Sequence, residues 1–154
     1  MPKRSKEDTL ITVNLILDTA THQLLTMGYD KMSYTTLSQA TKISRTGISH
    51  HFPKKTDFLL ALQGRFLTVI IDQLNLTKGL VELETSWRKA LFNQDFVAVL
   101  RLTFHHSVVH QGGEAFSGQL MHSVIAVINH RMNTDATKSV ERLFGVSLIQ
   151  IAAR

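Results

Sequence analysis

The stretch KISRTGISHHFPKK, Lys42 to Lys55, decides the fold of this 154-residue chain. Ser44 is a favoured N-cap residue, because its hydroxyl can accept hydrogen bonds from the free amides of a first helical turn. Pro53 ends the helix, since the residue before a proline disfavours helical backbone angles. We therefore predict a short helix from Ser44 to His51 that carries polar and basic side chains.

Two more helices are predicted upstream of this segment. Apolar residues recur every three or four positions from Thr9 to Met27, which is typical of an amphipathic helix, and Gly28 can end it in a left-handed conformation. Ser33 can cap a second, shorter helix. The predicted apolar face of the first helix is Leu10, Val13, Leu17, Ala20, Leu24 and Met27. The predicted core of the three helices is Leu37, Ala40, Ile43, Ile48 and Phe52.

Two short helices joined by a tight turn can place the second helix in the major groove of DNA. Arg45 can donate paired hydrogen bonds to guanine, and hydroxyl groups can bind a phosphate or a base. Gly47 allows the backbone to approach the duplex closely. Lys55, at the start of the next predicted helix, is placed to meet a phosphate together with the free amides of that helix.

The rest of the sequence is also helical in pattern, and no stretch shows the strict alternation of a half-buried strand. We predict an all-α fold with a helix-turn-helix head over residues 1–65 and a helical body over residues 66–154. The predicted later helices run from Lys55 to about Asn75 and over Trp87–Leu91, Phe96–Val109, Phe116–Arg131 and Val140–Ala153.

Composition and charge limit the classes of function. The sequence has no cysteine, which excludes disulfides, thiolate zinc sites and thiol catalysis. The net charge is +5, and residues 1–65 hold nine Lys or Arg against five Asp or Glu, whereas residues 66–154 hold eight against seven. The basic excess in the first part is consistent with a polyanionic partner or with a solvated basic surface.

The chain carries no sign of export or of membrane insertion, so we expect a cytoplasmic protein. It also has no glycine-rich phosphate loop and no nucleophile in a recognisable setting, and we expect neither an enzyme nor a cofactor. A small histidine-dependent hydrolase and a helix-turn-helix adaptor that no longer binds DNA are the alternatives.

Several side chains have both a functional and a purely structural interpretation. His106 and His110 would share a helix face and could bind a divalent ion, but neutral histidines are the better interpretation, and no metal is expected. The basic residues Lys3, Arg4 and Lys6 could form an arm along the DNA backbone or a solvated terminus.

The aromatic residues and the last two helices of the body are open to two interpretations. The aromatic residues could line a small effector pocket or form a plain core; they are Trp87, Phe92, Phe96, Phe104 and Phe116. The last two helices could pair with their copies in a second subunit or be buried within one subunit. Their apolar residues are Phe116, Leu120, Val124, Ile128, Val140, Leu143, Phe144 and Ile151.

The segment GYDKMSYTTLSQATKISRTGISHHFPKKTDFLLAL, Gly28 to Leu62, resembles the TetR family of regulators without a gap. The shared features are the Gly-Tyr pair after the first helix, Ile43-Ser44, and HHFPKK followed by a hydrophobic pair. The resemblance covers roughly residues 9–65. The opening MPKRSKEDT and the stretch YDKMSYTTLSQ are further similar to a short member of the family tied to quorum sensing and bioluminescence.

The resemblance implies a homodimeric repressor that binds a pseudo-palindromic double-stranded DNA operator, with dual activation and repression as an alternative and an unknown small-molecule effector as a further partner. By position it implies DNA contacts at Thr35, Thr36, Arg45, Thr46, Gly47, Ser49, His50 and Lys55.

Two departures from the family pattern have structural consequences. Many members have glycine where Lys42 stands, so either Lys42 adopts a left-handed conformation at a cost of about 1 kcal/mol or the turn differs. Many members also have tyrosine where Ser49 stands, which predicts a different footprint on DNA.

Overall fold

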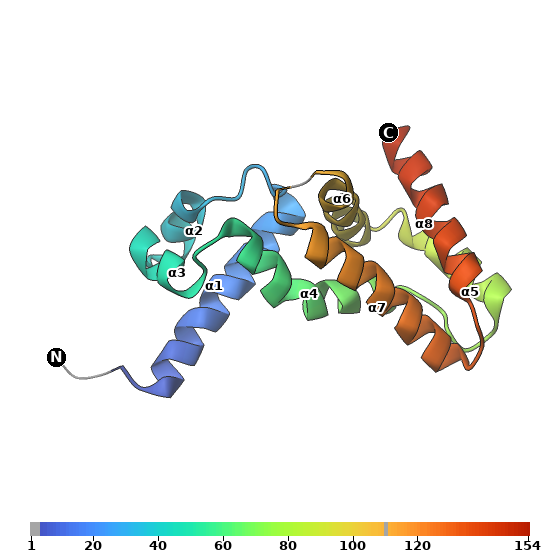
Figure 1. The fold of residues 1–154 in the computed structure, drawn as a ribbon, viewed down its shortest axis with the longest axis horizontal. Helices are drawn as coiled ribbons and strands as arrows, with labels where there is room; N and C mark the ends of the chain where they lie inside the picture. Colours follow the sequence, from blue (N-terminus) through green and yellow to red (C-terminus); the bar gives the residue numbers. More distant parts are fainter. Residues whose placement is uncertain (1–3, 110) are drawn as a thin grey trace. The chain divides into compact units, whose positions relative to one another are not determined.

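The computed structural model describes residues 4–109 and 111–154, and these residues form eight helices and no strand (Figure 1). The all-α prediction is confirmed. The helices are α1 (Lys6–Thr26), α2 (Tyr34–Thr41), α3 (Arg45–His51), α4 (Lys55–Ile71), α5 (Leu80–Ala90), α6 (Gln94–Val108), α7 (Glu114–Met132) and α8 (Thr137–Ala152).

The chain divides between Leu62 and Gln63 into two compact units, which we call the head and the body. The head holds α1, α2, α3 and the first half of α4, and the body holds the rest of α4 and α5 to α8. The predicted boundary after residue 65 also lies within α4. Among the described residues, no helix combines the length and apolarity that crossing a membrane requires.

Helix α1 begins earlier than predicted because Ser5 caps it. The Ser5 hydroxyl accepts a hydrogen bond from the Asp8 amide at 3.0 Å, and the Asp8 carboxylate accepts one from the Ser5 amide at 3.3 Å. This reciprocal pair satisfies two amides that the helix leaves unbonded. After α1, Gly28 has a φ of 87°, so the predicted left-handed glycine is confirmed.

The predicted apolar face of α1 is wrong at its ends, where Leu10 and Met27 are exposed. Two polar residues, Thr12 and Gln23, share the buried stripe, and an apolar pattern cannot predict them. The Thr12 hydroxyl donates to the Asp8 carbonyl at 3.0 Å, which removes the cost of burying it. The buried residues of α1 are Thr12, Ile16, Ala20, Gln23 and Leu24.

The predicted core of the head is confirmed for Leu37, Ile48 and Phe52 and wrong for Ala40. Ala40 is exposed, and the buried residue on this part of α2 is Thr41, four positions after Leu37 on the same helix face. Thr41 can occupy the core because its hydroxyl donates to the Leu37 carbonyl at 2.8 Å.

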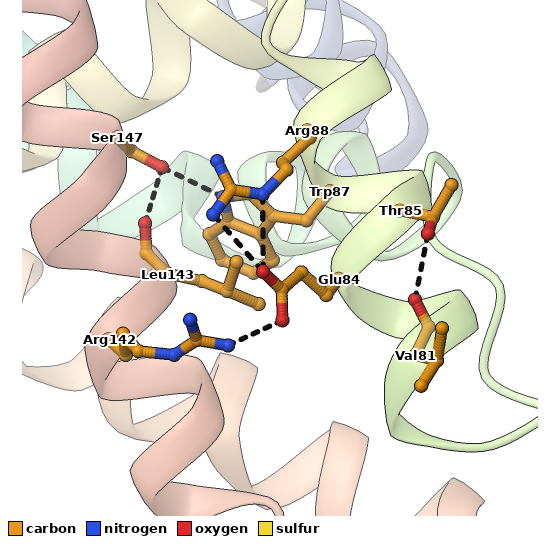
Figure 2. A network of polar contacts seen from close by, with 8 residues as sticks. All are labelled: Val81, Glu84, Thr85, Trp87, Arg88, Arg142, Leu143 and Ser147. Carbon is orange, nitrogen blue, oxygen red and sulfur yellow. Dashed lines mark hydrogen bonds and ion pairs between the residues drawn. The ribbon is translucent and has the colours of Figure 1, made fainter.

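The core of the body is built around Trp87, which has no exposed surface. Its ring lies edge-on to Phe96 and Phe144, with centroid distances of 5.5 and 5.3 Å. The indole Nε1 donates to the Ser147 Oγ at 2.8 Å, and Ser147 donates in turn to the Leu143 carbonyl at 2.7 Å (Figure 2). The buried polar groups of this junction between α5 and α8 are thus satisfied.

An ion-pair cluster at the surface joins the same two helices. The Glu84 carboxylate pairs with Arg88 on its own helix at 3.1 Å and with Arg142 of α8 (Figure 2). Hydrogen bonds from Arg88 and Arg142 hold the pKa of Glu84 below its ordinary value. Such exposed pairs stabilise a fold little, so the junction depends mainly on the buried Trp87.

The body differs from the sequence prediction at several points. Helix α5 begins at Leu80 rather than Trp87, and its buried stripe already includes Leu83, four positions before Trp87. Phe92, predicted as a core or pocket residue, is 79% exposed. Seven of the eight apolar residues of α7 and α8 that could have faced a second subunit are instead buried within the chain. They are Phe116, Leu120, Val124, Ile128, Val140, Leu143 and Phe144. The eighth, Ile151, is half-buried.

Candidate nucleic-acid interface

Helix α3 is only seven residues long and depends on side-chain contacts at its two ends. At its start, the Ser44 Oγ accepts a hydrogen bond from the Gly47 amide at 3.0 Å, as the predicted cap requires. On its inner face, Ile48 is fully buried. At its end, the Phe52 amide donates to the Ile48 carbonyl at 2.9 Å. The helix therefore has one face fixed in the head.

The opposite side of α3 presents polar groups to solvent. Arg45, Thr46 and His50 are exposed, and Ser49 is half-buried. The Ser49 hydroxyl donates to the Thr46 carbonyl at 3.2 Å, and its oxygen keeps its acceptor capacity. These four residues, all predicted DNA contacts, thus lie together on one short helix whose inner face is buried.

Gly47 has a structural role that the sequence prediction did not include. A Cβ atom at this position would lie 3.1 Å from both the Ile43 Cγ2 and the Ser44 Oγ. Glycine therefore lets the first turn of α3 close against the turn that precedes it. Close approach to a duplex, the reason predicted for Gly47, remains a prediction.

A tyrosine that the sequence reasoning did not single out ties α2 to the end of α3. The Tyr34 hydroxyl donates to the Phe52 carbonyl at 2.5 Å, and the rings of Tyr34 and Phe52 both lie against Phe58, with centroids 6.0 and 4.7 Å from it. Burial raises the pKa of Tyr34, with a smaller contribution from Asp57, so its hydroxyl remains a donor. This contact fixes the end of α3.

The two threonines at the start of α2 differ in their surroundings. Thr35 is exposed, and its predicted contact with a phosphate is open to it. The Thr36 hydroxyl instead lies 2.6 Å from the Gln23 Oε1 and completes the cap of α2 by accepting from the Ser33 amide at 2.9 Å. The Thr36 hydroxyl is therefore engaged within the head, and its predicted phosphate contact stays a prediction. The spacing Ser33-x-x-Thr36 is the signal that could have predicted this cap.

Lys42 adopts the left-handed conformation that was one of the two predicted alternatives. Its φ is 63° and its ψ is 16°, and it is the C-cap of α2. The turn between α2 and α3 therefore contains a left-handed residue, a conformation that glycine adopts without steric cost, with an exposed lysine side chain.

The segment that carries this surface is basic, with Asp30 and Asp57 flanking it in sequence. The sequence contains no Asp or Glu between Lys31 and Lys55, and five Lys or Arg lie from Lys31 to Lys55 inclusive. Lys55 itself is half-buried, and its Nζ lies 4.1 Å from the centre of the Tyr29 ring. A surface of this kind attracts the phosphates of a nucleic acid.

Other predicted candidates lie elsewhere or outside the described residues. His106 is buried, whereas His110 and Lys3 lie outside the described residues. Residues 4–109 and 111–154 contain no group of three or more His, Cys, Asp or Glu side chains that could hold a metal ion. Arg4 and Lys6 are exposed at the start of α1, which is compatible with both interpretations of the basic arm.

The fold and this surface define a helix-turn-helix transcription regulator that binds DNA. Residues 16–62 match the family model described as bacterial regulatory proteins of the TetR family. Residues 63–151, more than half of the chain, match the tetracycline repressor LuxT C-terminal domain. The chain therefore belongs to the TetR family and is related to LuxT. No curated protein matches it.

Proposed function

We propose that this regulator is a homodimeric repressor that occludes a promoter by binding a pseudo-palindromic operator. The observation that carries the proposal is the exposed polar side of α3, with Arg45 and His50 in solvent and Ile48 fixed in the core. A short helix held on one face and polar on the other is the form of element that reads the major groove.

The side chains of this surface have different proposed roles. Arg45 donates to a guanine, because its planar guanidinium matches the two acceptors of that base. Thr46, Ser49 and His50 contact bases or phosphates, and Lys55 contacts a phosphate. Thr35 contacts a phosphate at the start of α2, and the Gly47 backbone lies close to the duplex. Thr36 supports this surface through the cap of α2.

The proposed dimer forms through the outward faces of α7 and α8. Each helix carries an interior glycine, Gly118 or Gly145, where an added Cβ would meet no described atom within 4 Å beyond its chain neighbours and the nearby backbone of its own helix. Glycine inside a helix costs about 1 kcal/mol relative to alanine, and packing within this chain does not require it. A closely packed partner helix would require it. Leu148 and Ile149, both exposed on α8, supply apolar surface for that contact.

The proposed process is quorum-sensing control of the bioluminescence type. Its support is the match of residues 63–151 to the LuxT C-terminal domain, together with the similarity of the first residues to a short regulator of that kind. A dimer would place two α3 helices on half-sites about one helical turn of DNA apart.

Selection of DNA from a random-sequence duplex pool, followed by binding measurements at several salt concentrations, tests this proposal. We expect an enriched inverted repeat, two chains per duplex, and a log–log salt slope of about −0.9 for each phosphate contacted. Enrichment of a single half-site with one chain per duplex would contradict the dimer. A salt-independent affinity without any enrichment would contradict DNA binding at this surface.

A further inference from the structure

The first lysine of α4 is packed against an aromatic ring from the turn after α1. The Lys55 Nζ lies 4.1 Å from the centre of the Tyr29 ring, within the range in which the negative face of an aromatic ring attracts a cation. Tyr29 follows Gly28, whose φ of 87° turns the chain sharply at the end of α1. The backbone of this turn therefore sets the position of the ring.

The surroundings of Lys55 and Tyr29 shift the pKa of both side chains. Burial lowers the pKa of Lys55, and the Asp30 carboxylate acts in the opposite direction. Burial also raises the pKa of Tyr29, with smaller contributions from Asp30 and Tyr34, so the phenol stays neutral and its ring keeps its ordinary attraction for a cation. The Lys55 ammonium is thus partly desolvated and restrained before any ligand arrives.

Lys54 is the natural comparison, since it precedes Lys55 and carries the same charge. Lys54 is exposed, and its backbone amide donates to the Asp57 carboxylate at 2.8 Å. A free lysine loses considerable rotamer entropy when it is immobilised on a ligand. Lys55 has lost part of that freedom in the folded protein, so its contact with a phosphate costs less at the moment of binding.

We propose that Tyr29 is a positioning residue for DNA binding, whose ring holds the Lys55 ammonium ready to contact a backbone phosphate. This inference rests on the proposed DNA contact of Lys55. The Gly28-Tyr29 turn then has a function beyond packing, because it holds the Lys55 ammonium in position at the start of α4.

A double-mutant cycle tests the proposal on the full-length protein. The probe is a fluorescein-labelled duplex that the wild-type protein selects from a random-sequence pool. We expect Tyr29→Phe to bind like wild type, because the ring face remains, and Tyr29→Leu to bind about two- to fivefold more weakly. In a Lys55→Ala background, the Tyr29→Leu effect should vanish. In a Lys54→Ala background, it should persist unchanged.

Two further measurements separate positioning from a general loss of structure. Lys55→Ala should reduce the log–log salt slope by about 0.9, whereas the Tyr29 variants should keep the wild-type slope because the charge remains. Replacing Tyr29 by phenylalanine carrying one, two and then three fluorine atoms preserves the shape of the ring and weakens its attraction for a cation. The affinity should then fall stepwise.

The results that overturn the inference are equally definite. An unchanged affinity along the fluorinated series, or a Tyr29→Leu effect of equal size with and without Lys55, would show that the ring acts only through packing. If Lys55→Ala leaves both affinity and salt slope unchanged while Arg45→Ala weakens binding, this inference fails and the proposed function stands. If the wild-type protein shows no salt-dependent binding to any duplex, both fail.

Discussion

The head and the body of this protein are stabilised by different means. In the head, α2 and α3 have eight and seven residues, which is too short for stability in isolation, and serine caps and a left-handed lysine fix their ends. In the body, the helices are longer and pack around the buried Trp87. Both units bury apolar side chains, but α1, α2 and α3 of the head all begin at serine caps, whereas α5, α7 and α8 of the body have no side-chain cap hydrogen bond.

This difference matters for function. Local caps fix α3 while leaving its outward residues free to vary, so the DNA sequence that it reads can change without loss of the fold. The body buries its aromatic residues and leaves the outward faces of α7 and α8 for the proposed partner subunit. Changes in the two regions should therefore affect different measurements.

The largest effect is expected in the core of the body. Trp87→Ala should lower the free energy of unfolding by about 3–5 kcal/mol, because it removes a large buried side chain and leaves the Ser147 hydroxyl without its donor. Urea denaturation followed by circular dichroism measures this loss. Phe92→Ala, at a residue that is 79% exposed, is the control and should change stability by about 0.5 kcal/mol or less. Equal losses in the two variants would contradict the assigned core.

The next largest effect is expected on self-association, through the outward face of α8 in the body. Leu148→Glu should weaken self-association by about 30-fold, because it places a charge in the apolar surface proposed for the interface. Sedimentation equilibrium measures the dissociation constant of the dimer. Val81→Glu is the matched control, since Val81 is also exposed but lies on α5, and it should leave association unchanged. A Leu148→Glu protein that associates like wild type would place the interface elsewhere.

The smallest expected change in stability concerns two non-glycine residues with a left-handed backbone, Lys42 in the head and Asn133 in the body. Lys42→Gly should stabilise the protein by about 0.5–1 kcal/mol, because the strain relieved exceeds the added flexibility of the unfolded chain. Asn133→Gly should have almost no effect, since asparagine tolerates this conformation well. Thermal denaturation of both variants checks the comparison. A destabilised Lys42→Gly protein would mean that the lysine side chain supports the turn in another way.

The head could be predicted from the sequence in most respects because its signals are local. Ser33, Ser44, Gly28 and Pro53 act within a few residues of their own positions, and the helices begin and end where these residues predict. The errors in the core of the head, such as the exposed Ala40, arise where a polar residue is buried, and the start of α1 was missed because the local signal of the Ser5 cap was not used.

The candidate site was predicted in its outline but not in its supports. The polar face of α3 follows from spacing, whereas Gln23 bonds to Thr36 across 13 positions of sequence. The contact of Tyr34 with Phe52 likewise depends on the folded head. Such partners are set by tertiary structure, and no local pattern identifies them.

The body was predicted less well for the same physical reason. Its helices follow from apolar periodicity, but which of their apolar faces is buried depends on neighbouring helices. Phe92 and Trp87 are both aromatic residues near the end of α5, yet one is exposed and the other fully buried. The predicted partner-facing residues of α7 and α8 were the buried ones, because the most regular apolar stripe packs within the chain.

The measurement that tests the central claim most directly is the affinity of Arg45→Ala for the selected duplex, determined by fluorescence anisotropy at fixed salt. Loss of base contacts should weaken specific binding by about 1–3 kcal/mol, relax the preference at one base of each half-site and leave the thermal stability unchanged. The control is Lys78→Ala, at an exposed residue of the body. An Arg45→Ala protein that binds the duplex as tightly and as selectively as wild type would contradict the account.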